Sequence, residues 1–397
     1  MNRHEKRDSI CFLTNAYPDP ASPYPMYGRF IGELAEQIVR NDFRVSVVTP
    51  RIFRHSKACE TRGQERIYRF WFWSDNRLLI EHRRIPAVKM VTYLLSGTLL
   101  GLRVVTKDHC GLIHAHWALP AGLIAVVVGR VLRIPVVVTV HGSDARLAFE
   151  KKGLLRMLFA WTLKRADSVT AVSRNIAEEI RALGIVEDKT IVFPMGVSDR
   201  FFRSRPAGAL LPGPEGRTVI VSNRHLLPLY NVGCLIDAIP HVVHDSSDVL
   251  FLIAGDGRAR PALEARVERR GLAPWVRFLG AVDHEQMPAL LESSHIYVST
   301  SPSDGTSLSL LEAMACGLFP VVTDIPANRE WIEEGVNGFL VPPDDEIALA
   351  ERIKQAVRDE AMRRRAGLVN MELARQKASW PEICRILMRT YRLLAAI

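Results

Sequence analysis

The feature that most constrains the fold of this chain is a long alternation of short, β-rich apolar runs with longer segments of helical pattern. In the first half, the runs lie at 10–14, 45–49, 112–115, 136–140, 168–172 and 191–193. A second series follows at 219–222, 250–254, 276–279, 296–299 and 319–323. Because parallel strands need crossover connections, this alternation predicts α/β sheets that are doubly wound, with helices on both faces.

The two series of runs are separated by residues 204–216, which are rich in proline and glycine. This composition is typical of an interdomain linker. A chain of 397 residues also exceeds the usual size of a single core. We therefore predict one Rossmann-like domain over 1–203 and a second over 204–379, followed by an amphipathic helix over 380–397.

Composition indicates a globular protein, since 48% of the residues are hydrophobic and 24% are charged. The apolar run 10–13 is too short for the core of a signal peptide, and the runs 90–102 and 117–129 fall short of a membrane-spanning helix. The six cysteines are scattered singly, as in a protein with reduced thiols. We expect a cytoplasmic protein without a transmembrane helix.

The formal net charge of +9 suits an anionic donor, an anionic lipid surface or nucleic acid. No nucleic-acid-binding module accompanies it, so nucleic acid is not expected as a partner. Basic and apolar residues occur together over 77–103, which favours peripheral contact with the inner face of the cell membrane. A solvated helix is the alternative for the same segment.

The most specific local pattern runs from Ser299 to Gly317. It predicts a strand end at 296–298, a small-residue loop at 303–307 and a helix over 308–315 that Gly317 closes. Unpaired N–H groups at such a helix start favour an anion. Two carboxylates, Asp304 and Glu312, flank the position to which those donors point, which suits a sugar carried on a nucleoside diphosphate.

This segment resembles the retaining glycosyltransferases of family 4 (glycosyl transferases group 1, GT-B fold), which carry an acidic residue, seven others and a glutamate in the same strand–loop–helix setting. The usual motif begins Glu-Gly-Phe-Gly, whereas this chain has Asp304-Gly305-Thr306-Ser307. The resemblance implies that the loop and helix start, Gly305, Thr306, Ser307 and Leu308, bind the donor diphosphate. It also implies that Glu312 holds the ribose and that Asp304 contacts the sugar. A core helix with a solvated glutamate is the alternative for this segment alone.

A second part of the resemblance lies where the apolar strand 136–140 runs into His141-Gly142-Ser143-Asp144. The family has a His-Gly turn at this point, which implies that His141 contacts the sugar near the reacting centre. The alternative is an ordinary helix start in which Ser143 or Asp144 is the N-cap and His141 a loop residue.

Two further features of the first half are typical of the family. The segment 113–122 contains His114 and His116, which we expect to point to opposite faces of the strand and to be structural or cleft-lining rather than metal ligands. Gly28 precedes a helix over 31–39 and would let the backbone approach the donor closely. Relatives often have two adjacent glycines in this loop, whereas this chain has one. A plain helix-entry turn explains the segment as well as a catalytic loop does.

The second half opens with the strand 219–222, followed by Arg224 and Tyr230. Typical relatives have an arginine and a lysine here, so the resemblance implies that Arg224 clamps the donor diphosphate. Tyr230 stands where the lysine is expected, with one inserted residue before it, which questions the clamp or the activity itself. The turn 254–257 is also common in the family, but it fails as a dinucleotide fingerprint because Arg260 replaces the third glycine.

The resemblance extends from about residue 10 to about residue 345. It implies a GT-B fold, with an acceptor-binding first domain and a nucleotide-sugar-binding second domain facing each other across a cleft, and with the last helix crossing back to the first domain. The implied activity is a retaining, hexosyltransferase-like transfer from a nucleoside-diphosphate sugar to a hydroxyl of a glycan, lipid-linked or small-molecule acceptor, as in polysaccharide or glycolipid biosynthesis. No Asp-x-Asp occurs in the chain, so we expect metal independence and no cofactor beyond the donor substrate.

Two alternatives of other classes stay open at the level of sequence. Tyr230 and Asp304 are compatible with a catalytically silent GT-B protein that binds a nucleotide sugar or a partner enzyme. The second alternative is an epimerase or phosphorylase of the same two-domain shape. The Glu312 motif argues against this alternative.

Overall fold

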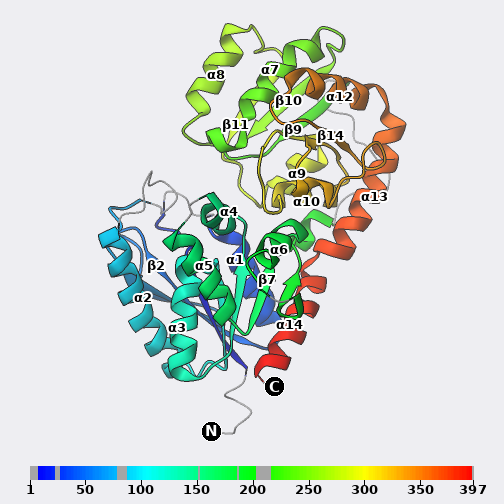
Figure 1. Ribbon diagram of the computed structural model, residues 1–397. Helices are drawn as coiled ribbons and strands as arrows, with labels where there is room; N and C mark the ends of the chain where they lie inside the picture. The colour runs from blue at the N-terminus through cyan, green and yellow to red at the C-terminus, as the bar shows by residue number, and fades with distance from the viewer. Residues whose placement is uncertain are drawn as a thin grey trace. The chain divides into compact units, whose positions relative to one another are not determined.

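The computed structural model describes residues 8–22, 27–77, 87–150, 153–185, 187–202 and 216–395, which belong to two compact units (Figure 1). The first unit comprises Met1–Pro194 and Trp380–Ile397, and the second comprises Met195–Ser379. The division falls before the predicted boundary at 203, because Val197 and Phe201 pack in a core of the second unit. The predicted linker lies outside the described residues, Gly216 excepted.

The first unit is built on an eight-stranded sheet in the order β3-β4-β2-β1-β5-β6-β7-β8. All neighbouring strands are parallel except β3 and β4, which are antiparallel. The strands are β1 (Ser9–Thr14), β2 (Arg44–Arg51), β3 (Cys59–Arg62), β4 (Glu65–Trp71), β5 (Leu112–His116), β6 (Val136–Val140), β7 (Ser168–Ala171) and β8 (Thr190–Val192). The β3–β4 pair was not predicted, because the sequence Cys-Glu-Thr-Arg of the edge strand β3 has no apolar run.

The helices of the first unit cover both faces of this sheet. They are α1 (Arg29–Arg40), α2 (Ala87–Lys107), α3 (Leu123–Leu132), α4 (Ser143–Glu150), α5 (Leu154–Arg165), α6 (Arg174–Arg181) and α14 (Trp380–Ala395). The chain moves along the sheet in one direction from β1 to β2 and in the other from β4 to β5, so right-handed crossovers place α1 and α2 on opposite faces. The terminal helix α14 packs against α1 and β5 of the first unit, as the family resemblance implied.

One helix among the described residues, Val88–Lys107 within α2, is long and apolar enough to cross a membrane by length and composition. The sequence-based estimate of 90–102 was too short, because it ended the apolar run at the flanking cations. In the structure α2 packs closely on its neighbours through two glycines. A Cβ atom at Gly97 would lie 2.7 Å from Ile124 Cδ1, and one at Gly101 would lie 3.1 Å from Val128 Cγ2. Helix α2 therefore belongs to the layer of helices that covers one face of the first unit's sheet.

The second unit has a six-stranded sheet in the order β11-β10-β9-β12-β13-β14, and every pair is parallel. Its strands are β9 (Thr218–Ser222), β10 (Val249–Ala254), β11 (Val276–Gly280), β12 (Ile296–Ser299), β13 (Phe319–Thr323) and β14 (Phe339–Val341). Its α-helices are α7 (Val232–Val243), α8 (Arg260–Arg269), α9 (Met287–Glu292), α10 (Leu308–Ala315), α11 (Pro326–Arg329), α12 (Glu346–Arg358) and α13 (Glu360–Ala378). Strand β14 was not predicted because it is only three residues long. The prediction of two doubly wound sheets is confirmed.

The strand order reverses once in each sheet, beside β1 and β5 in the first and beside β9 and β12 in the second. In open α/β sheets the crevice beyond the carboxyl ends of the strands at such a point is the usual ligand site. The loops that follow β9 and β12 carry Arg224 and residues 303–307, while His141 follows β6, the neighbour of β5. Topology thus gathers the predicted residues at two switch points.

Candidate active site

The helix start at the end of β12 has the predicted form. Ser307 is the N-cap of α10, and its Oγ accepts a hydrogen bond from the backbone N–H of Leu310 at 3.4 Å. Leucine and alanine favour the helix that follows, and Gly317 closes it with a φ of +74°, a conformation that glycine adopts without strain. Asp304, Gly305 and Thr306 lie in the half-buried loop before the cap.

Arg224 is buried beside this helix start, with only 8% of its surface exposed. Its Nη1 donates to Ser307 Oγ at 2.7 Å and to Ser309 Oγ at 2.9 Å, while Nη2 donates to the two carboxylate oxygens of Asp304 at 2.8 and 2.9 Å. Burial by itself would lower the pKa of Arg224, but the Asp304 carboxylate outweighs it and raises that pKa. The predicted phosphate ligand and the predicted sugar-contacting acid therefore form one buried ion pair.

Tyr230, which replaces the expected lysine, covers the Arg224 guanidinium. Its ring centroid lies 4.4 Å from Arg224 Cζ, within the range of a cation–π contact. The backbone around it is anchored to the loop after β12, because Thr300 Oγ1 donates to the carbonyl oxygen of Asn231 at 2.8 Å. Tyr230 brings no charge to this site but orients the cation that is present.

The glycines of the turn 254–257 support the Arg224 loop. A Cβ atom at Gly255 would lie 2.2 Å from the carbonyl oxygen of Arg224, and one at Gly257 would lie 2.5 Å from that of Leu226. Both glycines also have positive φ, and Leu226 N–H donates to the carbonyl oxygen of Asp256 at 3.0 Å. The two glycines are therefore needed because the backbone of this turn lies close to the backbone of the Arg224 loop. This structural role agrees with the failure of the turn as a dinucleotide fingerprint.

Glu312 is buried on α10 and is held by a histidine that the sequence analysis missed. His284 Nε2 lies 2.8 Å from Glu312 Oε1, and the His284 ring packs edge-on against Phe201 at 5.0 Å between centroids. His284 follows β11, so its position beyond the carboxyl end of a strand was the signal that could have indicated it. The pair fixes the orientation of the Glu312 carboxylate.

In the first unit, His141 stands at the carboxyl end of β6 among aromatic rings. Its Nε2 lies 3.2 Å from His116 Nδ1, and its ring lies 4.8 Å from that of Trp117 and 5.2 Å from that of Phe30. Burial lowers the pKa of His141 to about 3. The side chain is therefore neutral at physiological pH and can serve only as a hydrogen-bonding group there.

Asp144 organises the turn that presents His141. Its carboxylate accepts hydrogen bonds from the backbone N–H groups of Ala118 at 2.7 Å and His141 at 3.1 Å. Burial raises the pKa of Asp144 to about 6, although these N–H groups act in the opposite direction. Ser143 accepts from Trp117 Nε1 at 3.1 Å. Asp144 thus binds two loops together in the first turn of α4, and contact of His141 with the sugar stays a prediction.

The prediction for His114 and His116 was wrong in its geometry. The two residues are two positions apart on β5, so their side chains share one face, and their ring centroids lie 4.3 Å apart. His114 joins the core network, with Nδ1 2.5 Å from Tyr391 Oη of α14 and Nε2 2.6 Å from Thr139 Oγ1. His116 lies between His114 and His141. The three rings form one row, in which His114 and His116 are buried and His141 is half-buried.

Gly28 is explained by the local packing of its own unit. It is the N-cap of α1 with a φ of +81°, and a Cβ atom there would lie 2.6 Å from the carbonyl carbon of Ala16. This close approach of two backbone segments requires glycine whether or not a donor binds nearby. A role for Gly28 toward the donor stays a prediction.

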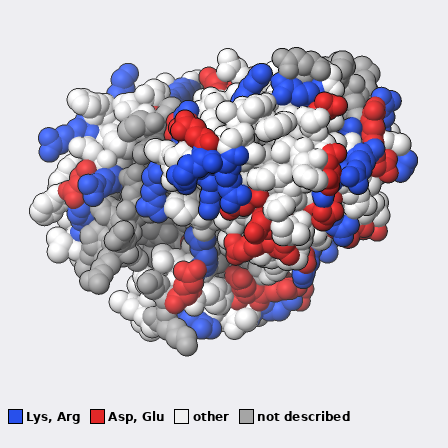
Figure 2. Space-filling view, turned by 90° about the horizontal axis from the view of Figure 1, so that it is seen from above, with Lys and Arg blue, Asp and Glu red and all other residues white. Residues whose placement is uncertain are grey.

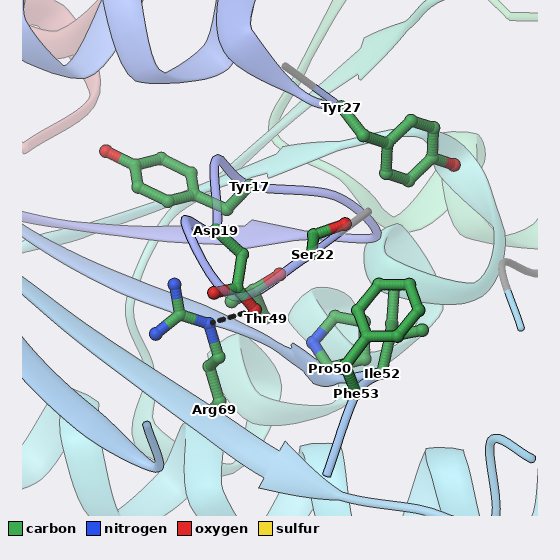
Figure 3. A pocket seen from close by; sticks show the side chains of 9 residues that line it. All are labelled: Tyr17, Asp19, Ser22, Tyr27, Thr49, Pro50, Ile52, Phe53 and Arg69. Carbon is green, nitrogen blue, oxygen red and sulfur yellow. Dashed lines mark ion pairs between the residues drawn. The ribbon is translucent and has the colours of Figure 1, made fainter. Parts of the chain in front are cut away.

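A pocket opens at the carboxyl ends of β1, β2 and β4 in the first unit (Figure 3). It is lined by Tyr17, Asp19, Ser22, Tyr27, Thr49, Pro50, Ile52, Phe53 and Arg69. Arg69 is buried, with its Nε 3.7 Å from Asp19 Oδ2 and its Nη2 2.7 Å from Glu60 Oε1. The wall therefore combines aromatic rings, hydroxyl groups and a compensated cation.

The face of the molecule that Figure 2 shows does not present one continuous charge. Figure 2 shows several groups of Lys and Arg side chains with groups of Asp and Glu between them. The net charge of +9 is therefore an excess of cations within a mixed surface, at least on the face in this view.

Comparison with solved structures identifies the fold. The chain superposes on sucrose-phosphate synthase from Thermosynechococcus elongatus with a TM-score of 0.79 and 20% identity, covering 98% of this chain and 100% of that one. An Anabaena protein crystallised with UDP-glucose gives a TM-score of 0.75 at 19% identity, with 97% and 100% covered. The fold is that of the GT-B glycosyltransferases.

Sequence comparison then identifies the family. Residues 27–201 match the model described as Glycosyltransferase Family 4, and residues 211–368 match Glycosyl transferases group 1. The chain belongs to the family 4 glycosyltransferases. Similar curated proteins include a phosphatidyl-myo-inositol mannosyltransferase of Mycobacterium leprae, 29% identical over 67% of this chain and 69% of that protein. Another is an N-acetyl-alpha-D-glucosaminyl L-malate synthase of Bacillus anthracis, 26% identical over 66% and 70%.

Proposed function

We propose that this glycosyltransferase is a retaining enzyme that moves a sugar from a nucleoside diphosphate to an acceptor hydroxyl, in polysaccharide or glycolipid biosynthesis. The observation that carries the proposal is the cluster at the β9/β12 switch point, where Arg224, the start of α10 and Glu312 lie on adjoining segments. The solved Anabaena relative that was crystallised with UDP-glucose supports a nucleotide-sugar donor.

The donor diphosphate is proposed to bind Arg224 and the N-terminus of α10. Both Nη atoms of Arg224 are engaged, Nη1 by two serine hydroxyls and Nη2 by the Asp304 carboxylate, so a phosphate must share the guanidinium with these groups or take their place. Arg224 Nε is buried and makes no hydrogen bond within the described residues, which leaves one donor for a phosphate oxygen. Glu312, oriented by His284, would accept from the ribose hydroxyls.

The proposed reaction takes place on one face of the sugar. The bond between the anomeric carbon and the phosphate oxygen breaks, and its electron pair goes to the diphosphate. The acceptor oxygen bonds to the anomeric carbon from the same side, and its proton passes to a donor phosphate oxygen. Arg224 and the helix start would stabilise the charge that develops on the leaving diphosphate, without a metal ion. Neutral His141 would hydrogen-bond the sugar.

The acceptor is proposed to bind the pocket at the ends of β1, β2 and β4. Tyr17 holds one side of it rigidly, because its hydroxyl donates to Glu65 Oε2 at 2.8 Å and both groups are buried. A hydroxylated acceptor fits this lining, and the names of the mycobacterial and Bacillus relatives are those of enzymes acting on phosphatidyl-myo-inositol and malate. We place the reaction at the cytoplasmic face of the membrane.

A titration calorimetry panel of UDP, GDP and ADP tests the donor site. One of the three should bind to the full-length protein, and Glu312→Gln should weaken that binding by about tenfold, the loss of one hydrogen bond to a charged group. The matched control is Glu292→Gln at the end of α9, which should bind normally. If none of the three nucleotides binds, the donor site proposed here is wrong.

A second function is favoured by one specific observation, the ion pair between Arg224 and Asp304. A protein in which this pair never opens would bind a nucleotide sugar through other groups and leave it intact. Turnover of a bound donor in the presence of hydroxylated acceptors supports the enzyme, and stable donor over prolonged incubation supports the silent binder.

A further inference from the structure

Three neighbouring helices of the first unit, α2, α3 and α5, contain no aspartate or glutamate. They carry lysine or arginine at positions 89, 103, 107, 130, 156, 164 and 165. Because α3 contacts both α2 and α5, the three helices form one continuous layer on the sheet (Figure 1). On the opposite face α1 carries Glu33, which pairs with Arg29 at 2.8 Å, and α14 carries Glu382. The missing carboxylates therefore distinguish one face of the unit.

The same layer exposes nine large apolar side chains. On α2 they recur every three or four residues, on the side away from buried Tyr93, and are 56–68% exposed. The nine are Val88, Val91, Leu95 and Leu99 of α2, Val127 and Val131 of α3, and Leu154, Met157 and Trp161 of α5. Single exposed apolar residues are ordinary, but a group on three adjacent helices indicates an interaction surface. We call it the α2–α3–α5 face.

Cations lie among the apolar side chains as well as beyond them. Helices α2 and α5 run in the same direction, since each leads from the carboxyl end of one parallel strand to the amino end of the next. Lys89 and Arg156 lie in their first turns beside the exposed apolar residues, and Lys89 is paired with Asp75. Cations also occupy the last turn of each helix. The face is therefore apolar with cations at both of its ends.

We propose that the α2–α3–α5 face docks this protein on an anionic lipid bilayer. The apolar side chains would enter the boundary between headgroups and acyl chains, and the cations would contact anionic headgroups. A second copy of the chain is a worse occupant, because a two-fold contact would set cation against cation, with no carboxylate on the three helices to pair with them. The proposal does not depend on transferase activity.

Sedimentation with vesicles tests the proposal on the full-length protein. Vesicles of phosphatidylcholine alone are compared with vesicles of phosphatidylcholine and phosphatidylglycerol in equal parts. The protein should sediment with the mixed vesicles, and the double variant Leu95→Glu, Leu99→Glu should lower its partition coefficient by at least about tenfold. Arg103→Gln with Arg165→Gln should remove about fivefold per cation at low salt. Both pairs of side chains point away from the core, so the variants should fold.

A matched control separates this face from exposed apolar residues in general. Ile347 and Val369, on α12 and α13 of the second unit, are 51% and 45% exposed. The variant Ile347→Glu, Val369→Glu should sediment like the parent protein. The proposal is overturned if the parent stays in the supernatant with both vesicle types, or if the α2 variant binds as well as the control. It is also overturned if light scattering shows a dimer that the α2 variant dissociates, because the face would then bind a second copy.

Discussion

The row of histidines predicts a specific loss of stability at acid pH. Burial, helped by the nearby His141 ring, lowers the pKa of His114 from 6.5 to about 3. In the unfolded chain His114 takes up a proton as the pH falls below 6.5, whereas in the folded chain it stays neutral down to about 3. The free energy of unfolding should therefore fall across this window, by about 2 kcal/mol for His114 at about pH 5.

Asp144 acts in the opposite direction and must be separated from this effect. Its pKa is raised to about 6 by burial, so the folded chain binds that proton more readily than the unfolded chain does. This should offset about 1.4 kcal/mol of the loss at about pH 5. The total pH dependence of the protein is therefore a poor test, and the informative quantity is the change caused by removing one histidine.

The assay is urea denaturation at about pH 7.5 and about pH 5, followed by circular dichroism. For each variant the difference between the two free energies of unfolding is taken, so a general loss of stability cancels. His114→Gln should reduce the pH-dependent loss by about 2 kcal/mol relative to the parent. Equal pH-dependent losses in the parent and in His114→Gln would refute the reasoning, because His114 would then titrate normally in the folded state.

Four further predictions concern the proposed reaction. Arg224→Ala should lower kcat/KM by at least about a hundredfold, since a guanidinium makes two charge-assisted bonds to one phosphate. Tyr230→Lys should keep activity or strengthen donor binding. Steady-state kinetics would check both variants. His284→Ala should weaken nucleotide binding about tenfold in calorimetry, and His284→Gln should recover part of it. Asp19→Asn should raise the KM for the acceptor at least about fivefold and leave that for the donor unchanged. Activity should survive excess EDTA, and restoration of a lost activity by magnesium or manganese would contradict the metal-free phosphate site.

Much of the fold could be predicted because the buried strands of both sheets are continuous apolar runs. Strands β6, β12 and β13 have the predicted bounds, since apolar residues predominate in each and a polar residue follows. The β3–β4 pair was missed because an edge strand needs no apolar run, and its polar sequence carries no periodic signal. The length of α2 was missed because the helix tolerates both half-buried Lys89, which pairs with Asp75, and exposed Arg103.

The candidate site was predictable in its residues but not in their contacts. Ser307 could be identified as an N-cap because the helix signal is local. The ion pair between Arg224 and Asp304 joins loops 80 positions apart, so nothing local encodes it. The contact between His284 and Glu312 joins segments 28 positions apart and was missed for the same reason. The shared face of His114 and His116 was misjudged although the spacing of two fixes it.

The most direct test of the central claim is the anomeric configuration of the product. The purified protein would be incubated with a panel of nucleoside-diphosphate sugars and hydroxylated acceptors, and the new glycosidic bond would be followed by proton NMR from its first appearance. We predict that an α-linked donor gives an α-linked product, with release of one nucleoside diphosphate per bond formed. A β-linked product from that donor, or no glycosidic bond with any donor that binds, would contradict the account.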